Sequence, residues 1–386
     1  MNKSKRFFTG LLLAAYFLSS CKFSEDIRFE CPEVETDLSG LKSNGSLVLD
    51  GDETYRMDMD SLVKTQLNKA GNNFYYFAAS PEHNWIAYNS GEINELVVEG
   101  VNHKDTKFIS GKEDWAYAEW LNEKQLIVDL IQEEDNFDTV SKFLVLNPFT
   151  NERYFLDANY PEIFYDYWWR IIEYNGNLDQ VVYLQGDISG PFYYTLWDIP
   201  NKKTIVQLNA NGDLHVFPRW SSDGSQFVMA LSLSLEKGDF PSYEIFQVSR
   251  EGRITQLTHL SDYYPWVYVG DLSWSPNNRY IAFWYSHWSE DEEPFFGTSG
   301  DRYLGVLDLN KGDVTSYCIN GELDVELGSN KYSPPLWSPD SNQIIFRSQI
   351  GEHYVLDSQT ILLDIQENRA FLIGNALEPV GWLKSP

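Results

Sequence analysis

Aromatic side chains gather in two stretches of this chain, residues 259–270 and 287–302, and they are the groups best suited to binding. The candidate ligand-binding set is Tyr263, Tyr264, Trp266, Trp288, Phe295 and Phe296. The second stretch also holds an acidic run at residues 290–293. Aromatic rings beside carboxylates suit the apolar faces of sugar rings, and they suit basic protein segments through ion pairs and cation–π contacts. We therefore expect these residues to form a binding surface.

Residues that could perform catalysis show no recognisable pattern. The six histidines lack the spacing of metal ligands: His83, His103, His215, His259, His287 and His353. There is no Gly-x-Ser-x-Gly motif, and the Gly-Thr-Ser-Gly at residues 297–300 is interpreted as a loop. The acidic run lacks the alternating spacing of calcium loops. The sequence therefore predicts no catalytic residue, no metal site and no cofactor, and a non-enzymatic binding protein is favoured.

The first twenty residues have the pattern of a signal peptide. Lys3, Lys5 and Arg6 give a basic start, and residues 7–18 form an apolar run. That run is too short to span a bilayer and has the length of a signal-peptide core. We therefore expect residues 1–20 to be removed, with an ordinary secretory signal as the alternative to the lipoprotein signal described next.

Cys21 directly follows this segment in the sequence Leu18-Ser19-Ser20-Cys21, which resembles the lipobox of bacterial lipoproteins. The resemblance implies cleavage before Cys21 and a thiol that carries diacylglyceryl, with palmitate among its acyl chains. One chain binds a membrane only marginally, so two or three make a durable anchor. In enterobacteria-like sorting an Asp after the Cys retains the protein in the inner membrane. Lys22 therefore favours the outer membrane facing the periplasm, or the cell surface.

The charge of the chain limits its partners. Its formal net charge is −28, and loss of the three basic residues in the first twenty would leave −31. So much negative charge argues against binding nucleic acid and against resting on anionic lipid. It favours cations or a basic partner.

Cys31 and Cys318 are the only other thiols. An exported chain can oxidise them, so a disulfide that ties the N-terminal segment to the body is one expectation. Two unpaired cysteines are the alternative.

A short pattern recurs along the chain and predicts its architecture. Trp337-Ser338-Pro339-Asp340-Ser341 is one copy, and similar segments begin at Ala79, Trp220 and Trp274, with a weaker one at Trp120. Ser-Pro-Asp-Gly sequences have the chemistry of a tight turn. Apolar residues at the seventh and ninth positions after the start indicate a strand with one face in the core. Each unit therefore begins strand, turn, strand.

The spacing of these units is that of a β-propeller. With Trp169 and Trp382 included as starts, they lie 41 to 63 residues apart, close to the length of a four-stranded blade. The chain ends just after the first strand of a seventh unit, and residues 46–49, 54–59 and 62–67 are predicted to supply its remaining strands. The fold class is therefore all-β, a propeller closed by strands from both termini. Seven blades are favoured, and six are the alternative.

The repeated Trp-Ser-Pro-Asp pattern resembles that of TolB-type, WD-like propellers over residues 45–386. The expected domains are a signal peptide at 1–20, a lipidated tether at 21–44 and the propeller at 45–386. TolB is a periplasmic interaction propeller, so the resemblance implies binding to a protein or glycan. Some TolB-like propellers are polysaccharide lyases with a histidine-bound metal, which makes an enzyme acting on polysaccharide the alternative.

Propeller convention places both aromatic stretches on the face opposite the Ser-Pro-Asp turns. Long loops inside compact domains tend to be functional, and exposed aromatic clusters tend to contact something. We therefore expect this face to bind a protein partner or an envelope glycan. The alternative is that the rings pack between blades. The oligomeric state does not follow from the sequence.

Overall fold

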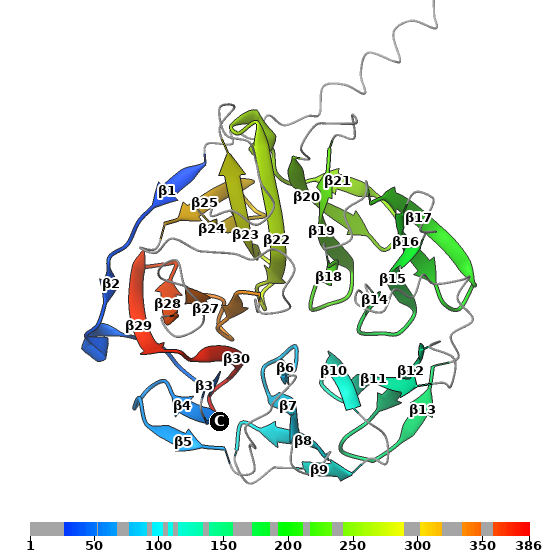
Figure 1. Cartoon of the computed structure of the whole chain (residues 1–386), viewed down its shortest axis with the longest axis horizontal. Helices are drawn as coiled ribbons and strands as arrows, with labels where there is room; N and C mark the ends of the chain where they lie inside the picture. The colour runs from blue at the N-terminus through cyan, green and yellow to red at the C-terminus, as the bar shows by residue number, and fades with distance from the viewer. Residues whose placement is uncertain are drawn as a thin grey trace, which may run out of the picture.

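The computed structural model describes residues 27–51, 53–67, 77–90, 95–102, 107–110, 115–133, 139–156, 172–185, 192–210, 217–233, 242–288, 302–318, 334–348 and 358–386. Seven sheets surround a common axis (Figure 1), which confirms the prediction of seven blades. Among the described residues, no helix is long and apolar enough to cross a membrane.

Blades 1 to 4 each have four strands in chain order. Blade 1 is β6 (Phe77–Ala79), β7 (Trp85–Ser90), β8 (Glu95–Gly100) and β9 (Lys107–Ser110). Blade 2 is β10 (Trp115–Asn122), β11 (Gln125–Glu133), β12 (Thr139–Leu146) and β13 (Arg153–Phe155). Blade 3 is β14 (Ile172–Tyr174), β15 (Gln180–Gln185), β16 (Tyr193–Asp198) and β17 (Lys203–Asn209). Blade 4 is β18 (Arg219–Trp220), β19 (Gln226–Ser232), β20 (Tyr243–Ser249) and β21 (Ile254–Gln256).

Blades 5 to 7 use strands from both ends of the chain. Blade 5 is β22 (Trp266–Trp274), β23 (Tyr280–Trp288), β24 (Arg302–Asp308), β25 (Asp313–Tyr317) and β1 (Arg28–Glu30). Blade 6 is β26 (Leu336–Trp337), β27 (Gln343–Ser348), β28 (Gln359–Asp364), β29 (Arg369–Asn375) and β2 (Val34–Glu35). Blade 7 is β30 (Glu378–Leu383), β3 (Ser46–Asp50), β4 (Tyr55–Asp58) and β5 (Lys64–Gln66). The 3-10 helices are η1 (Leu38–Gly40) and η2 (Leu260–Asp262).

The repeated turn is built as its residue types suggest. The Ser338 hydroxyl accepts hydrogen bonds from the backbone N–H groups of Asn342 and Gln343, at 3.2 and 2.9 Å, and so closes the turn. The fourth position after the start of the repeat has positive φ in five blades: His83, Leu178, Gly224, Asn278 and Ser341. Left-handed backbone is costly for most residues, so the closed turn must hold it in place.

In blade 3 the repeat begins at Tyr174, and the prediction that it begins at Trp169 is wrong. Asn175 takes the place of the serine, since its side-chain oxygen accepts from the N–H groups of Asp179 and Gln180. Tyr174 stands where other blades have Trp, and the next strand begins six residues later. Trp169 itself lies outside the described residues.

The repeated tryptophans join neighbouring blades. The indole Nε1 of Trp120 donates to the Ala78 carbonyl of blade 1, at 2.9 Å, and Trp274 donates to the Arg219 carbonyl of blade 4, at 2.8 Å. Trp220 and Trp337 make the same bond to the blade before them. A large ring that is at least partly buried and has its N–H satisfied contributes both packing and orientation, so this residue fixes blades 2, 4, 5 and 6 each against the blade before it.

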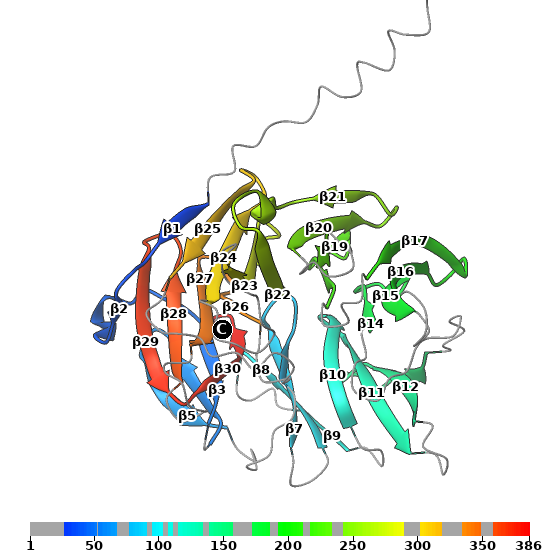
Figure 2. The ribbon, with the colours of Figure 1, turned by 45° about the horizontal axis from the view of Figure 1, so that its top comes forward.

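The N-terminal arm, residues 27–44, is packed on the propeller although residues 21–44 were expected to be a tether. β1 pairs in parallel with β25, and β2 pairs in parallel with β29, so the arm covers the outer edges of blades 5 and 6. Figures 1 and 2 show the blue arm running along the rim past both blades. Covered edges cannot pair with another chain.

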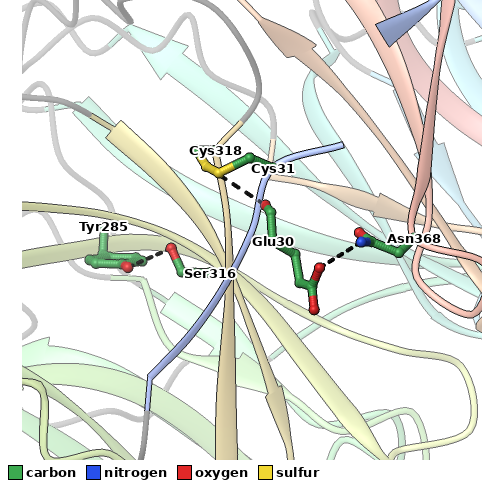
Figure 3. Close-up of a disulfide and its surroundings, with 6 residues drawn as sticks. All are labelled: Glu30, Cys31, Tyr285, Ser316, Cys318 and Asn368. Carbon is green, nitrogen blue, oxygen red and sulfur yellow. Dashed lines mark hydrogen bonds between the residues drawn. A yellow bond between two sulfur atoms is a disulfide. The ribbon is translucent and has the colours of Figure 1, made fainter. Parts of the chain in front are cut away.

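A disulfide joins Cys31, between β1 and β2, to Cys318, directly after β25, with Cα atoms 4.8 Å apart (Figure 3). The expectation of a disulfide is therefore confirmed over that of two unpaired cysteines. The arm is thus attached covalently to blade 5.

Candidate functional site

Four of the six predicted binding residues lie at one end of blade 5. Tyr263 and Tyr264 follow η2, Trp266 begins the innermost strand β22, and Trp288 ends the adjacent strand β23. That end is opposite the turn between β22 and β23, as the propeller convention predicts. Phe295, Phe296, the acidic run 290–293 and Cys21, the expected lipidation residue, lie outside the described residues.

The two tryptophans are direct neighbours across the β22–β23 pair. Trp266 and Trp288 face each other in the register, and both side chains are half-buried. Tyr263 is 46% exposed, which is high for an aromatic side chain. These rings therefore combine packing against the blade with surface that a ligand can contact.

A row of stacked rings lies on the other face of blade 5 from the two tryptophans, because His287 directly precedes Trp288 in β23 and successive strand side chains point to opposite faces. The Tyr264 ring is stacked on the His287 ring at 3.8 Å between centroids, and His287 is stacked on Tyr303 at 5.2 Å. Phe29 of the N-terminal arm then meets Tyr303 edge-on at 6.0 Å. We call these four residues the blade-5 aromatic row. It joins the loop after β21, two strands of blade 5 and the arm, and its members Tyr264 and Tyr303 are partly buried against the hydrophobic core shared by blades 3 to 5.

The tyrosines of this region are held neutral. Burial raises the pKa of Tyr264 and of Tyr285, and a hydrogen bond joins the two hydroxyls. The Tyr285 hydroxyl also donates to the Ser316 hydroxyl at 2.6 Å, as Figure 3 shows. Because Tyr285 is fully buried, these hydrogen bonds orient the rings and do not contact a ligand.

Glu244 on β20 positions the loop that carries Tyr263 and Tyr264. Its carboxylate is fully buried and accepts from the Thr258 hydroxyl at 2.7 Å. It also accepts from the backbone N–H groups of Leu260 and Ser261, at 2.9 and 2.8 Å. A buried carboxylate with three donors is a rigid anchor, so η2 and the two tyrosines have a fixed place on blade 4.

Sequence reasoning missed Glu244, Tyr303 and Phe29. The signal for Glu244 was a carboxylate inside an otherwise apolar strand, a type that is rarely buried unless paired. Tyr303 was read only as a strand residue, and Phe29 lay in the expected tether.

The histidines that could serve an enzyme are only partly described. His287 lies within the aromatic row, and His259 precedes η2, where its Nδ1 lies 3.1 Å from the side-chain nitrogen of Gln256. Within the described ranges, no group of three His, Cys, Asp or Glu residues could hold a metal ion. His103, His215 and His353 lie outside those ranges.

A second group of charged residues joins the innermost strands of blades 2, 3 and 4. Glu173 on β14 lies 3.3 Å from the guanidinium of Arg219 on β18, and Glu119 on β10 interacts electrostatically with both. The pKa of Glu173 is raised to about 8, mainly by burial and then by the negative charge of Glu119. The positive charge of Arg219 acts in the opposite direction and lowers this pKa. Glu173 is therefore mostly protonated in the neutral range.

We predict that Glu173→Gln flattens the pH dependence of stability. Between the ordinary pKa of 4.5 and about 8, folded Glu173 keeps a proton that the unfolded chain has lost. The free energy of unfolding therefore falls as pH rises through this window, by up to about 1.4 kcal/mol per pH unit. Glutamine keeps the neutral form and removes that slope. Denaturant unfolding at pH 5 and pH 8 measures it, and equal slopes in both proteins would contradict the assignment.

Comparison with known proteins shows the fold but no family. No protein-family model matches the chain, and no curated protein matches it in sequence. The structure of oligogalacturonate lyase from Vibrio parahaemolyticus is 15% identical with a TM-score of 0.51, covering 83% of this chain and 87% of the lyase. Acylaminoacyl peptidase from Pyrococcus horikoshii is 11% identical with a TM-score of 0.52, covering 83% of this chain and 47% of the peptidase.

TolB from Acinetobacter baumannii is also similar. It is 12% identical with a TM-score of 0.44, covering 89% of this chain and 80% of TolB. Identities this low carry the propeller architecture alone, because one fold hosts many functions. The chain is thus a seven-bladed β-propeller protein whose function must be argued from its own residues.

Proposed function

We propose that this protein is a lipid-anchored binding scaffold of the bacterial cell envelope. It presents the end of blade 5 to a protein partner or an envelope glycan. The observation that carries the proposal is the group of aromatic residues there, Tyr263 and the Trp266–Trp288 pair, with the blade-5 aromatic row on the other face of the blade.

The chemistry of this surface favours binding over reaction. Flat rings with neutral hydroxyls complement the C–H faces and hydroxyls of sugars, and they also accept basic or aromatic side chains. Glu244 fixes the loop before any ligand arrives, which lowers the ordering cost of binding. The acidic chain adds attraction for a basic partner.

The envelope location is supported by two features. The first is the signal-like start that ends at Cys21. The second is the Cys31–Cys318 disulfide, since such bonds persist in oxidising compartments outside the cytosol. An anchored scaffold would hold its ligand near the membrane.

We predict that Tyr263→Ala, Trp266→Ala and Trp288→Ala together abolish capture of the ligand from detergent-solubilised envelopes. Loss of these three aromatic residues removes the side-chain type that dominates most binding surfaces. The readout is mass spectrometry of captured proteins and glycans, with circular dichroism to verify that the variant folds.

The matched control is Tyr154→Ala with Phe155→Ala. These aromatic residues are 48% and 53% exposed on β13, in the blade opposite blades 5 and 6. The control should capture the ligand as wild type does. Equal capture by all three proteins would remove blade 5 as the site.

In the same fractions, Cys21→Ser should move the protein from the membrane to the soluble fraction, and retention of the variant in the membrane would refute the anchor.

A further inference from the structure

The place where the arm attaches to the propeller is fixed by several independent contacts. β1 and β2 add parallel strands to blades 5 and 6, and the disulfide lies between them. The Glu30 carbonyl accepts from the Cys318 N–H at 3.1 Å, and the Glu30 carboxylate accepts from the Asn368 side chain at 2.6 Å. Figure 3 shows the bond from Asn368, together with a weaker contact between the Cys318 sulfur and the same Glu30 carbonyl.

A bidentate ion pair holds the second strand of the arm. The Arg369 guanidinium donates to both carboxylate oxygens of Glu35, at 2.8 and 2.6 Å. Two parallel charge-assisted bonds define geometry as well as energy. The arm is therefore attached to both blade 5 and blade 6. We call the two strand pairs, the disulfide and the Glu35–Arg369 ion pair together the clamp.

The clamp shortens the connection between Cys21 and the propeller. Arg28, the first residue of β1, is the seventh residue after Cys21, so the connection spans about 25 Å at most when extended. Without the clamp, the connection would run to β3 at Ser46 and could reach about 90 Å. The arm thus decides which part of the propeller stays near a lipid attached at Cys21.

We infer that the rim formed by blades 5 and 6 is the membrane-facing surface of this protein, and that a lipid bilayer is its partner. The inference rests on the proposed lipid anchor at Cys21. Phe29 on β1 is 49% exposed, next to the point where the connection begins, and the adjacent Arg28, which forms an ion pair with Glu30, has a side chain that is 72% exposed. An aromatic ring beside a cation suits the lipid headgroup region.

The opposite rim offers a direct comparison. Blade 2 also carries exposed aromatic residues, Tyr154 and Phe155, but the arm does not reach it. If exposed rings alone selected the surface that faces the bilayer, blade 2 would compete with blade 5. If the clamp selects it, only blades 5 and 6 face the bilayer.

The test measures energy transfer from two matched sites to a dye in the bilayer. A lipid is coupled chemically to the Cys21 thiol of the mature chain, with Cys31–Cys318 oxidised, and the protein is placed on phosphatidylcholine nanodiscs that contain acceptor-labelled lipid. The donor is attached to a non-natural amino acid at Lys311 in blade 5 or at Thr150 in blade 2. Both residues are exposed in the turn between the third and fourth strands, so they differ mainly in blade.

We expect strong donor quenching at position 311 and weak quenching at position 150. Because the strand pairs could hold the arm without the disulfide, the release variant combines Cys31→Ser, Cys318→Ser and Glu35→Arg, which opposes Arg369. This variant should lose the difference between the two positions while keeping its near-ultraviolet circular dichroism. Reduction of the disulfide in the Glu35→Arg protein provides the same release without changing either cysteine.

Each other outcome overturns the inference. Equal quenching at both positions, or stronger quenching at 150, means that the bilayer does not face the clamped rim. If the difference in quenching between positions 311 and 150 is unchanged after the arm is released, the clamp does not determine which rim faces the bilayer. Lipidation in the native host is measured separately by the mass of Cys21. Its absence would defeat the proposed anchor without altering the nanodisc result.

Discussion

Arg56→Met is expected to lower the free energy of unfolding by about 3–5 kcal/mol, the usual cost of breaking a buried ion pair by removing one partner. Arg56 on β4 and Glu99 on β8 are 5% and 6% exposed, with 3.5 Å between the guanidinium and the carboxylate. Arg56 also donates to the carbonyls of Gly100 and Val101. Denaturant unfolding followed by tryptophan fluorescence measures the change.

The size of the effect follows from what the substitution leaves behind. Burial lowers the pKa of Arg56, while Glu99 opposes that shift, so the two charges compensate each other away from water. Methionine fills much of the space but leaves the Glu99 carboxylate buried without its cation. The pair also joins blade 7, which contains both chain ends, to blade 1. We therefore expect the substitution to weaken the contact between blades 7 and 1, which closes the ring.

Lys42→Met is the matched control. Lys42 and Glu367 form an ion pair at 3.4 Å, but their side chains are 83% and 44% exposed. Solvent-exposed pairs contribute about 0–1 kcal/mol, so this variant should unfold almost as wild type does. Equal changes in the two variants would contradict the buried pair, and Arg56→Met with Glu99→Gln should recover part of the loss.

The fold was predictable because its repeat is local. Each Ser-Pro-Asp turn and the alternating strand that follows it lie within ten residues of sequence. The number and spacing of these units predicted seven blades. The repeat start in blade 3 was missed because Tyr174 replaces Trp and Asn175 replaces Ser. The Asn175 side chain still closes the turn by accepting from a backbone N–H group, as Ser338 does in blade 6. A search for the hydrogen-bonding role, rather than for residue identity, would have found it.

The N-terminal arm could not be predicted in the same way. β1 and β2 are three and two residues long, too short to show an alternating pattern. Their structure comes from pairing with outer strands that lie 287 residues (Arg28 to Thr315) and 336 residues (Val34 to Ala370) further along the chain. Only the two cysteines carried a signal of that contact, and their pairing remained one of two alternatives.

The candidate site was predictable where its residues are close in sequence. Tyr263, Tyr264 and Trp266 lie in one stretch and stand together at blade 5. The residues that complete the surface come from β20, β24 and the arm, so only the tertiary structure brings them together. Periodicity assigns a residue to a face of a strand, but it does not say which ring it will stack on.

Replacing both Cys31 and Cys318 by serine is expected to lower the free energy of unfolding by about 2–5 kcal/mol. The bond closes a loop with a sequence separation of 287 residues, nearly the whole propeller. Such a long cross-link removes many conformations from the unfolded chain, and in the folded chain it holds an arm whose strands are very short. Denaturant unfolding without reductant, compared with wild type in reductant, measures the contribution.

The single variants provide the sharper test of that bond. A disulfide needs both sulfurs, so Cys31→Ser and Cys318→Ser should each lower the free energy of unfolding about as much as the double variant does. The second substitution should therefore add no further loss to the first. Cys21→Ser, which keeps the Cys31–Cys318 pair, should unfold at the wild-type midpoint. If the two single effects instead add up to the double, the sulfurs contribute separately through packing, and the covalent attachment of the arm to blade 5 would be wrong.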